Sequence, residues 1–282
     1  MNGRGPNLFG RDEAKRKVFN VIQDIMNYGC IMKAMIFAAG LGTRLRPLTD
    51  TMPKALVPVG GVPMLRHVID KLAAYGYDDF VVNVHHFPDA IISFLQQPGV
   101  ADVPGRRIAV SDERDLLRET GGGIRHARPL LEGTGGFLVH NVDILSDVNL
   151  AAFRANVHPE AISTILVSER QTSRYVLFND EMRLVGWTNV TTGEVRSPYG
   201  NINPRDYRML AFSGIHWMSD AIFQAFDKEK VDERFPIIDF YVSVCDRYPI
   251  YGYCPEKLRL LDIGKVDSLA KAESLLQELQ QG

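Results

Sequence analysis

From Lys33 onward, short apolar runs alternate with amphipathic segments, and this alternation limits the folds that the chain can adopt. The runs of the first half are "KAMIFAA" (33–39), "DFVVNVH" (79–85), "RIAVSD" (107–112) and "FLVHNVD" (137–143). They are mostly bounded by turn residues or charges, which is typical of strands buried on both faces. Helices are predicted between them, one beginning at Pro63 and one capped by Thr120 and running toward Leu131. Repeated strand, helix, strand units predict a parallel sheet with right-handed crossovers.

The second half is richer in strands and predicts a mixed sheet with one covered face. Its predicted strands are 161–169, 174–179, 183–187, 209–218 and 258–264, and its predicted helices are about 219–227, 236–246 and 265–280. Residues 1–31 stand apart, with one amphipathic helix expected to pack on the body or, alternatively, to bind a partner or a second copy of the chain. We therefore expect an N-terminal extension over 1–31 and one domain over 32–282.

Composition excludes several classes of protein. The net charge of −2 gives no chain-wide basic field for nucleic acid. No apolar run is long enough for a membrane span, and no apolar core of a signal peptide stands at the N-terminus, so a soluble cytoplasmic protein is expected. The cysteines Cys30, Cys245 and Cys254 are too scattered for a disulfide framework, and no Cys or His spacing suits zinc.

The segment "MIFAAGLGTRLRPLTDTMPKALVP" (35–58) places glycines and cations directly after the first strand. At the carboxyl edge of a parallel sheet, such a loop can direct backbone N–H groups at phosphate. The dinucleotide fingerprint lacks its third glycine here, and the Gly-Lys-Ser/Thr of a P-loop is missing. Arg44, Arg46 and Lys54 still concentrate positive charge around Gly40 and Gly42, which would suit a triphosphate held with a second phosphate. The alternative is a tight turn with solvated arginines.

The longer stretch "FAAGLGTRLRPLTDTMPKALVPVGGVPML" resembles the signature loop of the sugar-1-phosphate nucleotidyltransferases. The resemblance continues through "ETGGGI" (119–124), "HNVD" (140–143), "FSGIHWM" (212–218) and "LDIGKVDSLAKAE" (261–273). It implies a Rossmann-like three-layer α/β/α sandwich with a mixed, mostly parallel central sheet, of the nucleotide-diphospho-sugar transferase type. Within the family, the chain looks most like the N-acetylmuramate-1-phosphate uridylyltransferases of cell-wall recycling, followed by mannose- or heptose-1-phosphate guanylyltransferases.

The resemblance also implies roles for individual residues. The implied nucleotide contacts are Ala39, Gly40, Gly42, Thr43, Arg44, Glu119, Gly121, Gly122 and Asn141. Lys54 would contact phosphate near the reacting phosphorus, and Gly214 would border the sugar. Asp143 and Asp262 match the two Mg²⁺ aspartates of the family. Arg44, Lys54 and Asp143 are thus the candidate catalytic residues.

The chemistry implied by the resemblance explains this choice of residue types. A sugar phosphate oxygen attacks the α-phosphorus of a nucleoside triphosphate and expels pyrophosphate. Because the nucleophile is already ionised, the protein must align two anions and neutralise charge rather than supply a base. Asp143 and Asp262 each follow an apolar run, so they are predicted at strand ends, where Mg²⁺ would add waters and phosphate oxygens. Either Asp alone could be a helix cap or a surface charge.

Some positions depart from the wider family. Val142 precedes Asp143 where Gly-Asp is common, and "RYVLFNDEMRLVGWTN" lacks the lysine that holds the sugar phosphate in many members. Arg174 or another cation is a candidate substitute. The resemblance favours UTP and N-acetylmuramate-1-phosphate as substrates. The alternatives are a guanylyltransferase, a non-catalytic module that senses nucleotide sugars, and a glycosyltransferase, although the Asp-x-Asp of the last is absent at Asp143.

Overall fold

The computed structural model describes residues 32–281. The helix expected within 1–31, and any dimer contact through it, lie outside the described residues. The strands are β1 Lys33–Phe37, β2 Pro58–Val59, β3 Val62–Pro63, β4 Asp79–Val84, β5 Arg107–Asp112, β6 Gly136–Asn141, β7 Ile144–Ser146, β8 Ser163–Ser168, β9 Arg174–Phe178, β10 Leu184–Asn189, β11 Glu194–Arg196, β12 Arg208–Ser219, β13 Ile250–Tyr253 and β14 Leu260–Asp262. The helices are α2 Met64–Ala74, α3 Pro88–Leu95, α4 Glu119–His126, α5 Arg128–Leu131, α6 Leu150–Ala155, α7 Ala221–Glu229, α8 Ile237–Val244 and α9 Asp267–Gln281.

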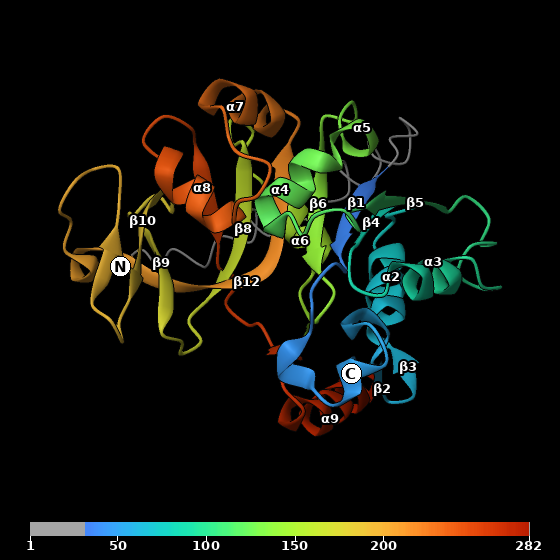
Figure 1. Cartoon of the computed structure of the whole chain (residues 1–282). Helices are drawn as coiled ribbons and strands as arrows, with labels where there is room; N and C mark the ends of the chain where they lie inside the picture. The colour runs from blue at the N-terminus through green and yellow to red at the C-terminus, as the bar shows by residue number, and fades with distance from the viewer. Residues whose placement is uncertain (1–31, 282) are drawn as a thin grey trace, which may run out of the picture. The chain divides into compact units, whose positions relative to one another are not determined.

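A ten-stranded mixed sheet forms the centre of the domain (Figure 1). The four strands predicted in the first half are parallel and lie in the order β6-β1-β4-β5. The long strand β12 pairs antiparallel with β6 and continues the sheet to β8 and β9. The chain passes from β1 to β4 and β5 on one side and then crosses to β6 on the other. The carboxyl ends of β1 and β6 therefore meet where the strand order reverses, which is the usual position of a ligand site in such sheets.

Helices cover both faces of the sheet, which confirms the three-layer α/β/α architecture. Along β1, Ala34 and Ile36 pack into one core cluster and Met35 into the other, as the alternation of side chains in a strand requires. Helices α2, α3 and α6 contribute apolar side chains to the first cluster, and α4, α5, α7 and α8 contribute to the second. No helix among residues 32–281 is long and apolar enough to cross a membrane.

The predicted helix from Thr120 to Leu131 is wrong in two respects. It is divided into α4 and α5 around Ala127, because Pro129 cannot donate a backbone hydrogen bond to the preceding turn. Thr120 is not its cap, since the residue at the N-cap is Arg118. The Thr120 hydroxyl instead accepts a hydrogen bond of 2.9 Å from the amide of Ile237. It thereby satisfies the first amide of α8, a helix far away in the sequence.

The predicted strand 258–264 exists as β14, but it is not part of the central sheet. It pairs antiparallel with β7, which directly follows the end of β6. Helix α9 then runs beside the β2–β3 hairpin (Figure 1), where Glu273 accepts a hydrogen bond of 3.3 Å from the amide of Gly60. The C-terminal segment is thus folded back onto the loops that follow the first strand.

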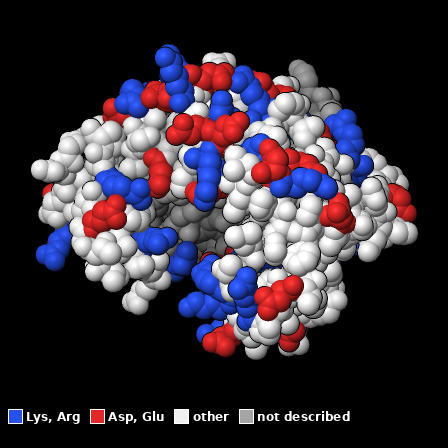
Figure 2. Space-filling view, viewed as in Figure 1, with Lys and Arg blue, Asp and Glu red and all other residues white. Residues whose placement is uncertain are grey.

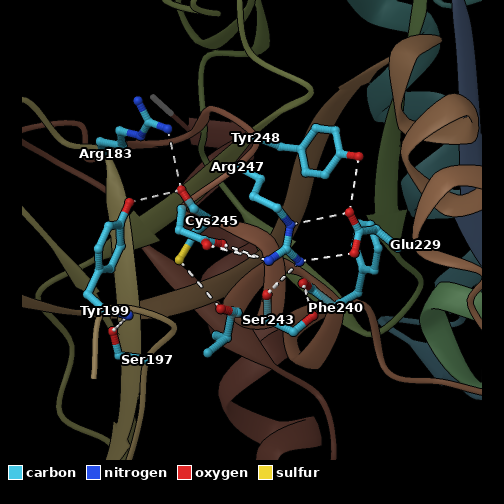
Figure 3. Close-up of polar contacts among 11 residues, drawn as sticks. Arg183, Ser197, Tyr199, Glu229, Phe240, Ser243, Cys245, Arg247 and Tyr248 are labelled. Atoms are coloured by element: carbon cyan, nitrogen blue, oxygen red, sulfur yellow. Dashed lines mark hydrogen bonds and ion pairs between the residues drawn. The ribbon is translucent and has the colours of Figure 1, made fainter. Parts of the chain in front are cut away.

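Helix α8 is held firmly at its C-terminal end. Figure 3 shows Arg183 and Tyr199 donating to the carbonyl of Cys245, at 3.4 and 3.1 Å. In the same view Arg247 donates to the carbonyl of Ser243 at 3.2 Å and to the carboxylate of Glu229 at 3.0 Å. Cationic donors at this end satisfy the unpaired carbonyls and oppose the helix dipole. The other end of α8, starting after Pro236, is thereby held beside the cavities described next.

Candidate active site

A cavity of about 430 Å³ opens at the carboxyl ends of β1 and β6. Its lining comes from the glycine loop, the end of β6, the start of α4 and the residue before α8. The lining residues are Phe37, Ala38, Ala39, Gly40, Lys54, Asn83, Leu117, Glu119, Thr120, Asn141, Val142, Asp143 and Pro236. Six of the predicted site residues are among them, namely Ala39, Gly40, Lys54, Glu119, Asn141 and Asp143. The structure therefore gathers residues more than a hundred positions apart around one hollow.

The glycine loop bends sharply after β1. Gly42 has a φ of +65° and precedes a turn of 3₁₀ helix, Thr43–Leu45, in which the amide of Leu45 donates to the carbonyl of Gly42 at 2.8 Å. The hydroxyl of Thr49 donates to the same carbonyl at 2.8 Å. A Cβ on Gly42 would lie 2.8 Å from Thr49 Cγ2 and 3.0 Å from Lys54 Cβ, so only glycine allows this close approach. Thr43 and Arg44 are exposed on the turn.

Lys54 and Asp143 form an ion pair in which both side chains are largely buried, with 12% and 14% of their surface exposed. Lys54 comes from the turn after Pro53, and Asp143 follows β6. Asp262 reaches the same place through the ladder between β7 and β14, where it pairs with Ile144 and where the amide of Ile263 donates to the Asp143 carbonyl at 2.8 Å. The two carboxylates are thus brought together by an antiparallel pair of short strands, rather than by neighbouring parallel strands.

The electrostatics of Asp262 show how close these charges are. Desolvation in the cavity, and then the negative charge of Asp143, raise the pKa of the Asp262 carboxyl above its ordinary value. Lys54, Arg44 and Arg170 act on the same carboxyl in the opposite direction. The Arg44 guanidinium lies against the backbone of Gly264, where an added Cβ would come within 2.8 Å of Arg44 Nη2. Two crowded carboxylates surrounded by cations are suited to binding both a divalent metal ion and phosphate.

The donor set is one that a hard divalent cation would accept. Among residues 32–281 there is no group of three or more His, Cys, Asp or Glu side chains that could hold a metal. Asp143 and Asp262 could therefore supply only two protein ligands, and the remaining ligands would be waters or substrate oxygens. This incomplete, all-oxygen set is typical of Mg²⁺ sites.

Gly214 and Asn141 lie next to each other beside Asp143. Gly214 has a φ of +73° and occupies an irregularity of β12, where the pairing with β8 shifts between Phe212 and His216. A Cβ at Gly214 would lie 3.0 Å from the side-chain nitrogen of Asn141 and 2.7 Å from Ile144. The glycine thus leaves room for the Asn141 side chain at the cavity edge. This packing does not test the predicted contact between Gly214 and the sugar, which stays a prediction.

Gly121 and Gly122 have a packing role that the sequence did not reveal. Their amides donate to the carbonyl of Phe235 at 2.8 and 3.2 Å, and a Cβ on either would lie 2.1 Å from Phe235 or Glu233. Neither glycine is among the residues that line the cavity. Glu119 does line it, with a left-handed φ of +60° and a hydrogen bond of 3.1 Å from Arg234. The nucleotide contacts implied for all three stay predictions.

Two functional candidates were missed by sequence reasoning. Asn83 lines the cavity and accepts a hydrogen bond of 2.8 Å from the amide of Ala38, while its amide group donates to the fully buried Glu113 at 2.8 Å. Glu113 thus holds the Asn83 side chain, and Asn83 holds the backbone of Ala38, just before the glycine loop. The available signal was a polar residue inside an apolar strand, "VVNV". Burial raises the pKa of the Glu113 carboxyl, and the hydrogen bonds from Asn83 and Arg118 lower it by less. The pKa of Glu113 therefore stays above its ordinary value.

His140 is a packed residue of β6 and takes no part in the cavity lining. It is fully buried, and its burial, followed by the charge of Lys71, lowers its pKa to about 3. His140 is therefore neutral at physiological pH and cannot cycle a proton there.

A second and larger cavity of about 1120 Å³ adjoins the first, since Pro236 lines both. Figure 2 shows Lys and Arg side chains gathered around a hollow on this face of the molecule. The cationic lining residues are Arg44, Arg170, Arg174, Arg196 and Lys265, and Asp262 lines the same cavity. The predicted substitute Arg174 thus faces the space that contains Arg44 and Asp262.

Comparisons with known proteins identify the family of this chain. A family model described as nucleotidyl transferase matches residues 33–183. The N-acetylmuramate alpha-1-phosphate uridylyltransferase of Caulobacter vibrioides is 49% identical over 256 residues, which cover 87% of this chain and 97% of that protein. The mannose-1-phosphate guanyltransferase of Aspergillus fumigatus is 36% identical over 148 residues, 51% of this chain and 40% of that protein. The solved inositol-1-phosphate CTP transferase from T. maritima matches the fold with a TM-score of 0.70 at 18% identity, covering 90% of this chain and 98% of that one.

The fold and the charged cavity are those of an α/β enzyme that acts on phosphorylated substrates. The chain belongs to the nucleotidyl transferase family, and the relatives that it matches are sugar-1-phosphate nucleotidyltransferases. The family predicted from the glycine loop is therefore confirmed, as is the fold class. Enzymes of this family generally depend on a divalent metal ion.

Proposed function

We propose that this chain is a Mg²⁺-dependent uridylyltransferase that joins UTP to N-acetylmuramate-1-phosphate, releases pyrophosphate and forms the UDP-sugar. The choice of substrates is supported by the relative from Caulobacter vibrioides, whose alignment covers nearly the whole of that protein. The single structural observation that supports the reaction is the meeting of Lys54, Asp143 and Asp262 beside the glycine loop: Lys54 and Asp143 line the smaller cavity, and Asp262 lines the adjoining larger one. Both substrates are anions, and this is where the chain concentrates the groups that can hold them together.

The proposed work of the residues is binding, alignment and neutralisation of charge. Lys54 lines the smaller cavity, where it can approach a phosphoryl group, and Arg44 offers its fork of donors in the adjoining larger cavity. Backbone amides of the Gly40–Thr43 turn are the candidates for binding the triphosphate. Because the sugar phosphate is already ionised, no side chain has to remove a proton from it. Alignment of two such anions can contribute about 7–11 kcal/mol to lowering the barrier.

Asp143 and Asp262 are the residues that would hold Mg²⁺. When bound, the ion would supply positive charge that neutralises phosphate oxygens. Asp143, which is paired with Lys54, would then also interact with the ion. The repulsion between the Asp143 and Asp262 carboxylates, which contributes to the raised pKa of Asp262, would be relieved. Removal of divalent ions with EDTA should abolish turnover, and added Mg²⁺ should restore it.

The proposal is tested by a matrix of nucleoside triphosphates against sugar-1-phosphates, with pyrophosphate release as the readout and product identity from mass spectrometry. UTP with N-acetylmuramate-1-phosphate should give the highest kcat/KM. GTP with mannose- or heptose-1-phosphate as the best pair would assign the guanylyltransferase alternative. Thermal stabilisation by nucleotide sugars without pyrophosphate from any pair would assign a sensing module, and release of a nucleoside diphosphate would assign a glycosyltransferase.

Two further points are proposals of location and assembly. The substrate UTP is a cytoplasmic metabolite, so we propose that the enzyme acts in the cytoplasm, which cell fractionation would test. A homo-oligomer formed through residues 1–31 stays a prediction. It would be tested by the molar mass in solution of the full chain and of a chain beginning at Met32.

A further inference from the structure

The larger cavity contains more positive charge than a single phosphate group requires. We call it the arginine pocket, defined by Arg44, Arg170, Arg174, Arg196 and Lys265. Of these, Arg196 is already neutralised: it contacts Asp239 at 2.8 Å and Glu194 at 3.5 Å, and its guanidinium stacks on Trp187 at 4.0 Å. Its charge is therefore engaged in holding the wall of the pocket.

In the part of the chain that the structure describes, no carboxylate lies within 4.0 Å of the charged nitrogens of Arg44, Arg170, Arg174 or Lys265. Among the described lining residues, one further carboxylate remains, that of Asp262, which belongs to the candidate metal site. Grouped cations without counter-charges are typical of a surface that binds an anionic ligand.

The loop that carries Arg170 is held in place by hydrogen bonds. It joins β8 to β9 over residues 169–173. The guanidinium of Arg170 donates to the carbonyl of Phe212 at 3.0 Å, and the amide of Val190 donates to the carbonyl of Ser173 at 2.9 Å. Arg174 begins β9 and pairs in register with Asn189. The guanidinium of Arg170 is therefore anchored to β12, and the backbone of Arg174 is fixed by its pairing with β10.

The four cations divide into two pairs. Arg44 lies beside Asp262, because a Cβ on Gly264 would come within 2.8 Å of Arg44 Nη2 and 2.7 Å of Asp262 Oδ1. Arg170 lines the same cavity and also acts electrostatically on this carboxylate, so these two cations are grouped with the candidate metal site. Arg174 and Lys265 line the same pocket but are not among the charges that most influence Asp262. One pair can therefore serve the phosphate of the sugar, while the other remains available to a second anionic group.

We propose that Arg174 and Lys265 bind a carboxylate on the sugar, and that they thereby select sugar phosphates that carry a second negative charge. This inference rests on the proposed function, because N-acetylmuramate differs from N-acetylglucosamine by a lactyl ether that ends in a carboxylate. The two 1-phosphates share the same ring, acetamido group and phosphate. They therefore form a matched pair that isolates the carboxylate.

The test compares N-acetylmuramate-1-phosphate with N-acetylglucosamine-1-phosphate, each with UTP. The measured quantity is the ratio of their kcat/KM values for the parent, for Arg174→Gln and for Lys265→Gln. Each substitution should lower this ratio about 10- to 100-fold, mainly through the KM for N-acetylmuramate-1-phosphate, because it removes one hydrogen bond to a charged group. The control is Arg205→Gln, an exposed arginine outside the pocket, which should keep the parent ratio.

A binding measurement separates recognition from turnover. Calorimetry with a non-hydrolysable UTP analogue present should show the same selective loss of affinity for N-acetylmuramate-1-phosphate in both pocket variants. A parent enzyme that uses the two sugars equally well would overturn the inference while leaving the proposed reaction intact. Unchanged ratios in both pocket variants would do the same. A parent that releases no pyrophosphate with either sugar would remove the proposed function and the inference together.

Discussion

Gly42→Ala should damage both the stability of the fold and the candidate phosphate loop, and the structure indicates by how much. A left-handed residue other than glycine costs about 1–2 kcal/mol. The added Cβ would lie 2.8 Å from Thr49 Cγ2, about 0.7 Å closer than the lower end of the range in which carbon atoms pack favourably. Overpacking of this kind costs about 1–3 kcal/mol. The expected loss of unfolding free energy is therefore about 2–5 kcal/mol.

Gly61→Ala is the matched control. Gly61 has a φ of +78° in the β2–β3 hairpin, and no atom lies within 4 Å of the position that its Cβ would take. Its substitution should therefore cost only the backbone contribution of about 1–2 kcal/mol. The stability of each variant is measured by urea unfolding followed by circular dichroism, and its activity by pyrophosphate release. The Cβ added at position 42 would also lie 3.0 Å from Lys54 Cβ and would displace that side chain. Activity should therefore fall about 10- to 100-fold in Gly42→Ala and stay near the parent in Gly61→Ala.

A second substitution tests the cause directly. Thr49→Ser removes the clashing Cγ2 and keeps the hydroxyl that donates to the Gly42 carbonyl. The double variant Gly42→Ala/Thr49→Ser should therefore regain part of the lost stability. If Gly42→Ala and Gly61→Ala were equal in unfolding free energy and in activity, the account of this loop as a tightly packed phosphate-binding turn would be refuted.

Three further predictions concern the surroundings of the site. His140 and His216 are buried, and burial lowers the pKa of each to about 3, so below pH 6.5 the unfolded chain binds protons that the folded chain does not. The free energy of unfolding in urea should therefore fall by about 2 kcal/mol per histidine from pH 7 to pH 5, and a value that does not change with pH would contradict this. Asn83→Ala leaves a buried amide and a buried carboxylate without their partner and should lower the unfolding free energy by about 2–4 kcal/mol, whereas a loss below 1 kcal/mol would argue against the buried pair. Thr120→Val keeps the side-chain shape but removes the acceptor for the Ile237 amide, so it should cost about 1 kcal/mol and speed amide exchange at Ile237; unchanged exchange would show that this contact is unimportant.

The strands of the first half could be predicted because their apolar runs are buried on both faces, and that pattern is local. Helix α3 was missed, although Pro88 stands at its first position, because it is short and its apolar residues follow two histidines and an aromatic residue. β7 was missed because its three residues are too few for a period to be visible, whereas β14, which is equally short, was predicted from the longer apolar run 258–264. The sequence therefore placed Asp262 at a strand end but could not show that this strand pairs beside Asp143.

Individual site residues differ in the same way. Ala39, Gly40, Lys54 and Asp143 belong to contiguous motifs next to strand ends, and the structure places all four around one cavity. Gly121 and Gly122 lie in an equally clear motif, but their close contacts with Phe235 and Glu233 depend on a segment more than a hundred residues away. Arg170 and Lys265 were not singled out, because a loop arginine or a lysine before a helix is ordinary until the fold places it beside a cavity.

The central claim is that Asp143 and Asp262 together hold the charge that nucleotidyl transfer requires. It is tested most directly by the rate of pyrophosphate release at saturating UTP, N-acetylmuramate-1-phosphate and Mg²⁺ for Asp143→Asn and Asp262→Asn. The exposed Asp180→Asn, which lies outside both cavities, serves as the control for loss of one carboxylate. Both site variants should stay folded and lose at least about 100-fold in rate, while the control keeps the parent rate. Parent rates in Asp143→Asn and Asp262→Asn would contradict the account.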